Sequence, residues 1–333
     1  MRSMIKAGLG ALATVMLSSC IFLSIPLSGA TSDYREIVLK AGHGPKVLVL
    51  DVDGVINSGA TTPGPFFSAR DSTVNEVAEK LAKARLDPSI KAIVLRVDSP
   101  GGGVTASDIV YKSLKDFKGK TNIPIYVSML DLAASGGYYI SMAGDEIYAH
   151  PTTITGSIGV IAMFPQFQGL GEKIGVYMEV LKSGKNKDIT GGFHNMSPEQ
   201  KAILQQMIDE MYGRFVAVVH EGRPKLSEEK IRELADGRIY TAQQAEANGL
   251  IDGVKYTDEV VELARARTGN AKAKVVLYRR SSQEKSDSVY AKSNPLPSME
   301  SKQNQTNVGL LNIDASGASA VAPASVFNYL WTP

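Results

Sequence analysis

The fold of the chain is inferred outward from one stretch, Leu132-Ala133-Ala134-Ser135-Gly136-Gly137-Tyr138-Tyr139-Ile140. The residues before it, 123–129, are rich in β-branched and aromatic side chains, which favour extended backbone. The residues after the serine, 137–143, are small or apolar and contain no proline. The sequence therefore predicts a strand, a tight turn at Ser135 and then a helix.

This serine turn has two interpretations. Ala134 and Gly136 leave the Ser135 hydroxyl uncrowded, and the Gly136 N–H at a helix start would favour an oxyanion formed there. Alternatively, the small residues only allow a tight turn to pack against a neighbour, because Ala-Ser-Gly-Gly is a common turn sequence. The segment alone favours the packing interpretation.

Strand and helix patterns alternate around this turn, which predicts an α/β domain with a largely parallel sheet. Ligands of such sheets bind beyond the carboxyl ends of the strands. The turn at 98–103 and the turn at Ser135 both fall there. The expected strands are 45–54, 91–97 and 123–129, and the expected helices are centred on 74–82 and 109–117.

A long helix is expected from Pro198 onward. Ser197 is its N-cap and Gln200 completes a capping box, and we assign Met207 and Met211 to its core-facing stripe. Composition changes to Ser, Gln, Asn, Lys and Pro after residue 280, which predicts a disordered tail. Further short strands are expected at 147–149, 155–161 and 176–181, with a last one ending at 277.

The composition excludes several classes of protein. The chain has 333 residues, is 44% apolar and 21% charged, and carries a net charge of +2, values typical of a globular protein with a sizeable core. Without a long basic run, nucleic acid is not expected as a partner. The single cysteine, Cys20, excludes disulfides within the chain and a thiolate metal cluster in the globular part.

Residues 1–30 form a leader with Arg2 and Lys6 ahead of an uncharged run, 7–30, long enough for a bilayer span of about 20 residues. Cleavage after Ala30, lipidation of Cys20 and an uncleaved anchor are the three possible fates. We favour the anchor because the apolar run continues beyond Cys20. In each case the positive flank stays cytoplasmic and the remainder is exported.

One competing enzyme class is suggested by Asp51 and Asp53, which end an apolar strand as in haloacid dehalogenase-like phosphatases. That chemistry needs Mg²⁺ held by further carboxylates, and the only candidate, 144–146, lacks a second aspartate at the required distance. We interpret the pair as solvated aspartates at a strand end.

A serine nucleophile needs oxyanion donors and a base. The N–H groups of Gly101 or Gly102 could join that of Gly136 as donors. A histidine or a lysine kept neutral by burial could serve as base, and spacing does not choose among the candidates. These are His43, His150, His194, His220, Lys182, Lys185 and Lys187.

A set of motifs from about residue 47 to 261 resembles the SppA-type signal peptide peptidase family, in order and with compatible spacing. The matching runs are 96–103, 133–139, 155–160, 182–184, 187–188, 236–241 and 249–252. The resemblance implies a ClpP/crotonase-like fold of repeated β-β-α units with a mostly parallel sheet. The tail after residue 280 aligns with nothing in the family.

The resemblance also implies a site without metal or cofactor, and a Ser–Lys dyad formed within one subunit. Family members assemble into rings or bowls, which implies a homo-oligomer. By resemblance the roles are Ser135 as nucleophile, Lys187 as base, Ser157 as support for the lysine, Gly102 and Gly136 as oxyanion donors, and Gly101 and Gly103 as substrate-binding residues.

The expected protein is thus a serine endopeptidase of the bacterial cytoplasmic membrane, anchored through residues 7–30, with its catalytic domain on the exported side. It would degrade cleaved signal peptides and other extended apolar peptides. A crotonase-like acyl-CoA enzyme and a catalytically inactive membrane scaffold are the alternatives. The expected domains are a leader at 1–30, a connector at 31–43, a catalytic domain at 44–280 and the tail at 281–333.

Overall fold

The structure is a computed structural model that describes residues 34–59, 72–280, 288–290 and 328–330. Its central element is one extended sheet. The strands of the described residues are β1 Tyr34–Lys40, β2 Lys46–Asp53, β3 Ile90–Ser99, β4 Gly101–Gly103, β5 Ile125–Ala134, β6 Glu146–Ala149, β7 Ile154–Gly156, β8 Ile239–Thr241, β9 Gly253–Val254, β10 Lys274–Arg280 and β11 Asn328–Leu330, and all except β4 and β11 belong to this sheet. The helices are α2 Thr73–Arg85, α3 Val104–Thr121, α4 Gly136–Ser141, α5 Gln168–Ile174, α6 Pro198–Gly222, α7 Glu228–Leu234, α8 Ala242–Ala247 and α9 Thr257–Arg267.

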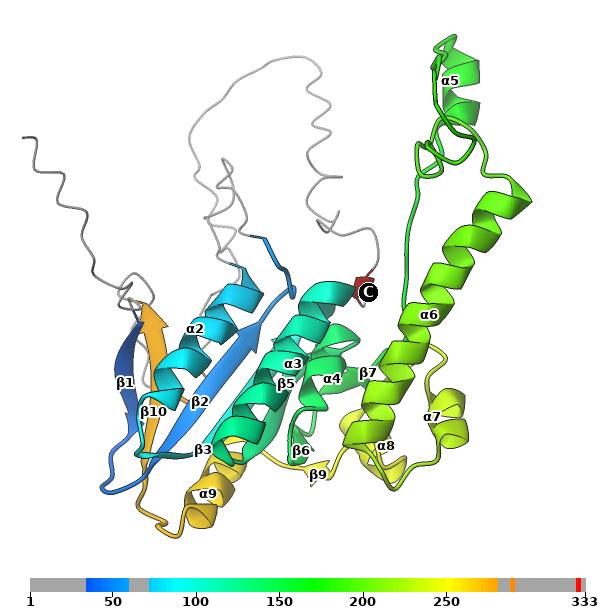
Figure 1. The fold of residues 1–333 in the computed structure, drawn as a ribbon. Helices are drawn as coiled ribbons and strands as arrows, with labels where there is room; N and C mark the ends of the chain where they lie inside the picture. The colour runs from blue at the N-terminus through cyan, green and yellow to red at the C-terminus, as the bar shows by residue number, and fades with distance from the viewer. Residues whose placement is uncertain (1–33, 60–71, 281–287, 291–327, 331–333) are drawn as a thin grey trace, which may run out of the picture. The chain divides into compact units, whose positions relative to one another are not determined.

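The sheet has the order β1-β10-β2-β3-β5-β6-β9, with β7 and β8 continuing from β5. Every pairing from β10 through β9 is parallel, while β1 joins the edge antiparallel to β10. The predicted mostly parallel α/β sheet is therefore confirmed (Figure 1). Short β4 and β11 form a separate antiparallel pair.

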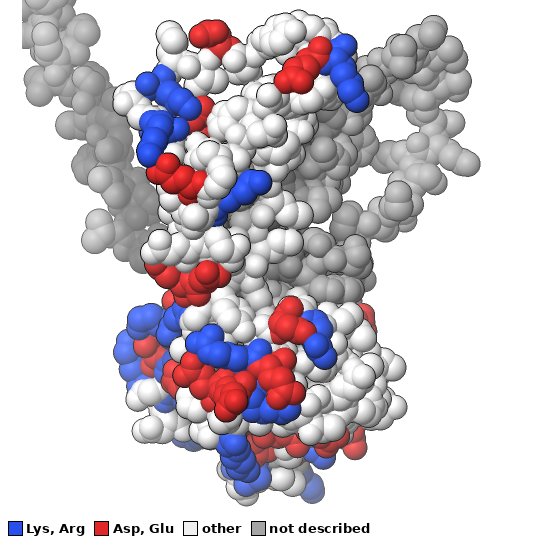
Figure 2. All heavy atoms as spheres, turned by 90° about the vertical axis from the view of Figure 1, so that its right-hand side faces the viewer, with Lys and Arg blue, Asp and Glu red and all other residues white. Residues whose placement is uncertain are grey.

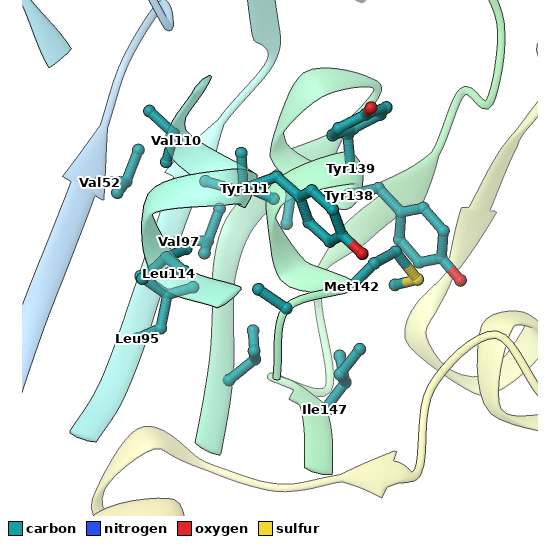
Figure 3. Packing of buried hydrophobic residues seen from close by; sticks show 14 of the residues in the cluster. Val52, Leu95, Val97, Val110, Tyr111, Leu114, Tyr138, Tyr139, Met142 and Ile147 are labelled. Atoms are coloured by element: carbon teal, nitrogen blue, oxygen red, sulfur yellow. The ribbon is translucent and has the colours of Figure 1, made fainter. Parts of the chain in front are cut away.

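Both faces of the sheet are buried, which explains the nearly continuous apolar sequence of its central strands. In β2, Leu48 and Leu50 face the larger core, which α2 and α3 cover, whereas Val47 and Val49 face a smaller core under α9. Figure 3 shows the larger core, where Leu95 of β3 lies with Leu114 of α3.

The buried end of β2 carries a cluster of charged groups. Asp51 accepts a hydrogen bond from Lys80 at 2.8 Å, and the Arg96 guanidinium lies 3.3 Å from its other oxygen. All three side chains are at most 1% exposed. Asp51 is therefore not the solvated aspartate that the sequence suggested, and its engaged oxygens leave it unsuited to act as a phosphatase nucleophile.

Several expected elements differ from those observed. The segment 31–43, expected to be a connector, contains the strand β1. This strand forms because it pairs with β10, a partner that the local sequence does not reveal. Residues 176–181 are not a strand but an exposed loop. Met207 is 42% exposed rather than core, because α6 packs mainly through its last two turns, where Phe215 and Val219 are fully buried.

We call residues 162–196 the arm. It includes α5, which buries no residue, and Gly192 is the only buried residue among the 35 described positions of the arm. The arm nevertheless has many large apolar side chains, and Figure 2, which views the molecule from the α6 side, shows uncharged surface between scattered charged groups in its upper part. Its exposed apolar residues are Met163, Phe167, Leu170, Ile174, Val176, Tyr177, Met178, Val180, Leu181 and Phe193.

The leader predicted as a membrane anchor lies outside the described residues. Within the residues that are described, no helix combines the length and the apolar character needed to cross a bilayer.

The buried charge cluster gives a first prediction. Replacing Asp51→Asn removes the fully buried carboxylate that pairs with Lys80 and Arg96, while Lys80 keeps its contact with Glu76, so the free energy of unfolding should fall by about 3–5 kcal/mol. Glu79→Gln is the matched control, because Glu79 pairs with Arg280 at the surface and should cost less than about 1 kcal/mol. Urea denaturation measures both. Equal effects would contradict the prediction.

The same cluster predicts a pH dependence. Burial opposes ionisation of Asp51, but the nearby Lys80 and Arg96 charges outweigh it and lower the pKa of that carboxyl. Since the folded-state pKa lies below the unfolded value, the stabilisation is present above about pH 4 and is lost as the pH falls through the folded-state pKa. The parent should lose stability below pH 4 more steeply than Asp51→Asn.

Candidate active site

Ser135 occupies the turn between β5 and α4, as the sequence predicted. Its backbone has φ 52° and ψ −114°, a conformation that residues with a side chain rarely adopt. Two hydrogen bonds fix it: the Ser135 N–H donates to the Gly156 carbonyl at 2.7 Å, and the Tyr139 N–H donates to the Ser135 carbonyl at 2.8 Å. Such a strained serine between strand and helix is typical of nucleophile turns.

The two glycine-rich turns meet beside this serine. A Cβ on Gly101, whose φ is +98°, would lie 2.5 Å from the Gly136 nitrogen, and a Cβ on Gly136 would lie 3.1 Å from the Gly102 nitrogen. Only glycine allows this approach of backbone to backbone. The structure thus brings together Gly102 and Gly136, the residues expected to stabilise an oxyanion.

Strand β4 is held in place by the loop after β2. The Ile56 N–H donates to the Gly101 carbonyl at 2.8 Å, and the Gly103 N–H donates to the Ile56 carbonyl at 3.0 Å. The Ser99 hydroxyl donates to the Gly54 carbonyl and accepts from the Gly101 N–H at 3.1 Å. These bonds leave one edge of β4 to pair with β11.

Ser157 lies next to Ser135, because β7 pairs with the end of β5 through Ala134 and Gly156. Ser157 is 9% exposed, has φ 50° and donates its N–H to the Arg238 carbonyl. The residue expected to support a catalytic lysine is therefore placed near the nucleophile.

Lys187 does not reach this position. It is exposed on the arm, and within the part of the chain that the structure describes no hydrogen bond joins it to Ser135. The other lysines of the loop have acidic partners: Lys182 pairs with Asp188 and Lys185 with Glu199. The expectation that Ser135 and Lys187 meet within one subunit is not met by this arrangement.

Three of the four histidines considered as bases are engaged away from the serine turn. His150 contacts Thr152 and the Tyr256 ring, His194 hydrogen-bonds within the arm, and His220 contacts the Leu226 carbonyl. None of these contacts involves Ser135.

An aromatic pocket follows the serine on α4. The Tyr139 ring packs edge-on against Tyr111 of α3 and Phe215 of α6, with centroids 5.5 Å and 5.0 Å away. The Tyr139 hydroxyl donates to Asp108, which also pairs with Arg214 of α6 at 2.9 Å. Burial and the hydrogen bond to Asp108 raise the pKa of Tyr139, so this network retains a neutral phenol.

The chain's own tail enters this pocket. Strand β11 pairs antiparallel with β4, with Tyr329 opposite Gly102, and Tyr329 is fully buried. Sequence reasoning did not identify this pocket. Two features of the sequence could have indicated it: the tyrosine pair after the serine, and the apolar end of a tail whose other residues are mostly polar.

These features fit a serine peptidase of ClpP-like architecture, and comparisons with known proteins agree. Residues 118–271 match the peptidase family S49, and residues 67–155 match the Clp protease family.

Individual relatives match a larger part of the chain than either family does. The chain is 36% identical to a protein of Enterococcus faecium described as a signal peptide peptidase SppA, over 75% of this chain and 72% of the relative. It is 38% identical to a protease of Synechocystis sp., over 70% of this chain and 78% of the relative. It is also 37% identical to Protease 4 of Salmonella typhi, over 69% of this chain and 36% of that protein. The chain belongs to the SppA-type signal peptide peptidases of peptidase family S49.

The strained turn yields a third prediction. Ser135→Gly should raise the free energy of unfolding by about 1 kcal/mol, because glycine adopts this backbone conformation without strain. Ser135→Ala removes the same hydroxyl but retains a Cβ and should show no such gain. Thermal unfolding of both variants measures the difference, and equal melting temperatures would contradict strain at this residue.

Proposed function

We propose that this family S49 serine peptidase is an endopeptidase in which Ser135 is the nucleophile and Lys187 the general base. The observation that carries the proposal is the strained serine with the Gly102 and Gly136 nitrogens converging beside it. Extended apolar peptides, among them remnants of cleaved signal peptides, are the proposed substrates. The names of the relatives support that substrate class.

In the proposed reaction, the Ser135 oxygen attacks the carbonyl carbon of a peptide bond while its proton passes to the neutral Lys187 amine. The Gly102 and Gly136 N–H groups stabilise the resulting oxyanion. The protonated amine then gives its proton to the leaving nitrogen, and an acyl-enzyme forms on Ser135. Water activated by Lys187 hydrolyses this ester and restores the enzyme.

The exposed position of Lys187 indicates how the site would be completed. A lysine acts as base only when it is uncharged, and burial favours the uncharged form. The arm that carries Lys187 has a large apolar surface with almost no buried residue, and such surfaces mark contacts with other proteins. We therefore propose a homo-oligomer in which the arm of one subunit brings Lys187 to Ser135 of its neighbour.

The proposal includes the membrane. Residues 7–30 would anchor the protein in the bacterial cytoplasmic membrane, with the catalytic domain on the exported side, where an apolar groove would meet peptides released from the bilayer. We also propose that the sheet and its helices are built from repeated β-β-α units, as in crotonase-like folds.

Single substitutions test the dyad. In the full-length protein in detergent, Ser135→Ala and Lys187→Ala should each lower kcat/KM for an apolar fluorogenic peptide roughly a thousandfold or more. Lys185→Ala is the matched control, because Lys185 lies on the same loop but pairs with Glu199, and it should retain parental activity. A Lys187→Ala enzyme with parental kcat/KM would reject Lys187 as the base. A parent without activity on any peptide would favour a scaffold or an acyl-CoA enzyme.

Mixing the two inactive variants tests the shared site. If Lys187 serves the neighbouring subunit, Ser135→Ala and Lys187→Ala chains that are dissociated and reassembled in equal amounts should recover up to about a quarter of parental activity, since random assembly restores that share of complete sites. A dyad within one subunit gives no recovery, because no mixed assembly then contains a complete site. Peptide hydrolysis after reassembly is the measurement.

A further inference from the structure

We infer that Lys182 and Asp188 form a charge-balancing pair for the proposed base: Lys182 neutralises the Asp188 carboxylate, so that the amine of the adjacent Lys187 loses its proton at a lower pH than it otherwise would. Both are positioning residues that act through Lys187. The role of Lys187 as base rests on the proposed function, whereas the pairing itself is a feature of the structure.

The pair closes the loop that carries Lys187. The Lys182 ammonium donates to both carboxylate oxygens of Asp188, at 2.7 Å and 2.8 Å. Inside the loop, the Lys187 N–H donates to the Gly184 carbonyl at 3.1 Å. The structure therefore fixes a compensated carboxylate one residue away from the proposed base.

Further contacts hold this carboxylate in place. The His194 Nε2 atom lies 3.0 Å from a carboxylate oxygen of Asp188 and 3.0 Å from its carbonyl oxygen, and the Gly191 N–H donates to the same carbonyl at 2.8 Å. The Asp188 side chain is 13% exposed. The hydrogen bond from Lys182 lowers the pKa of Asp188, so this carboxylate is ionised throughout the pH range in which a lysine loses its proton.

The charge of Asp188 bears directly on its neighbour in the sequence. A nearby carboxylate favours the charged form of a lysine amine, and this attraction strengthens when water is excluded, as the shared site of the proposed oligomer requires. Without a partner, Asp188 would keep Lys187 protonated and unable to act as a base. With Lys182 bound to the same carboxylate, the pair is neutral as a whole and its field at Lys187 largely cancels.

The remaining charged groups of the loop do not replace Lys182 in this role. Within the described residues, Lys182 and His194 are the titratable groups that contact Asp188, and a histidine is ordinarily uncharged above pH 7.5. Lys185 pairs separately with Glu199 of α6 at 2.7 Å. Lys182 is thus the cation that compensates Asp188 in the alkaline range, where the base has to lose its proton.

Opposite substitutions test the charge balance through the pH dependence of hydrolysis. With full-length protein in detergent, kcat/KM for an apolar fluorogenic peptide is measured from about pH 7.5 to 10.5, and the midpoint of its rise is determined. Lys182→Gln leaves the Asp188 charge unbalanced and should move the midpoint up by about 0.5–1 pH unit. Asp188→Asn leaves the Lys182 charge unbalanced and should move it down by a similar amount. The double variant Lys182→Gln/Asp188→Asn should return close to the parental midpoint.

Two further variants are the controls. His194→Gln removes the other side chain that contacts Asp188, and Lys230→Gln breaks an exposed pair with Glu233 on α7. Both should keep the parental midpoint. If the pair only shaped the loop, each single variant would lower kcat at an unchanged midpoint and the double variant would not recover. That result, or midpoint shifts of the same sign in both single variants, would overturn the inference.

Chemical labelling separates this inference from the proposed function. The reaction of the Lys187 amine with trace acetic anhydride, followed against pH by peptide mass spectrometry, reports the uncharged fraction of the amine without any hydrolysis. Opposite shifts in labelling, in a protein whose parent hydrolyses no peptide, would support the charge balance and reject the peptidase function. Hydrolysis by the parent, with unshifted profiles in both single variants, would reject the charge balance and leave the peptidase function standing.

Discussion

The hydrogen bond from the Ser135 amide to the Gly156 carbonyl is the interaction on which the site depends. It holds a residue with a side chain in a left-handed backbone conformation, and it does so where β5 ends against β7. The next residues must then enter α4 at once, with Gly137 packed so closely on Ser99 that a Cβ would lie 2.6 Å from the Ser99 carbonyl oxygen. The positions of the oxyanion donors and of the aromatic pocket follow from this single turn.

Much of this arrangement could be predicted because its signals are local. The strand before Ser135 and the small residues after it predict the turn, and the capping box at Ser197 predicts the start of α6, which the structure confirms. The meeting of Gly102 with Gly136 follows from parallel strands whose carboxyl ends share one edge. These inferences need only neighbouring residues and the general geometry of α/β sheets.

The parts that could not be predicted depend on distant partners. The local sequence predicts that Asp51 is solvated, because its partners Lys80 and Arg96 lie 29 and 45 positions further along the chain. Strand β11 is only three residues long and forms because β4 offers an edge more than 200 positions away. Lys187 is exposed because the arm buries only Gly192 among its own residues in the described part of the chain, so the family resemblance identified the residue but not its surroundings.

The pairing of β1 with β10 has a mechanical consequence. Tyr34 lies opposite Arg280, at the same end of an antiparallel ladder, so the first residue of β1 and the last residue of β10 share one corner of the sheet. A pulling force applied between residues 34 and 280 would load the hydrogen bonds of this ladder one after another, like a zipper, rather than all at once in shear. The edge strand would peel away at low force while the parallel strands behind it, and the serine turn at the far side of the sheet, remained under no tension.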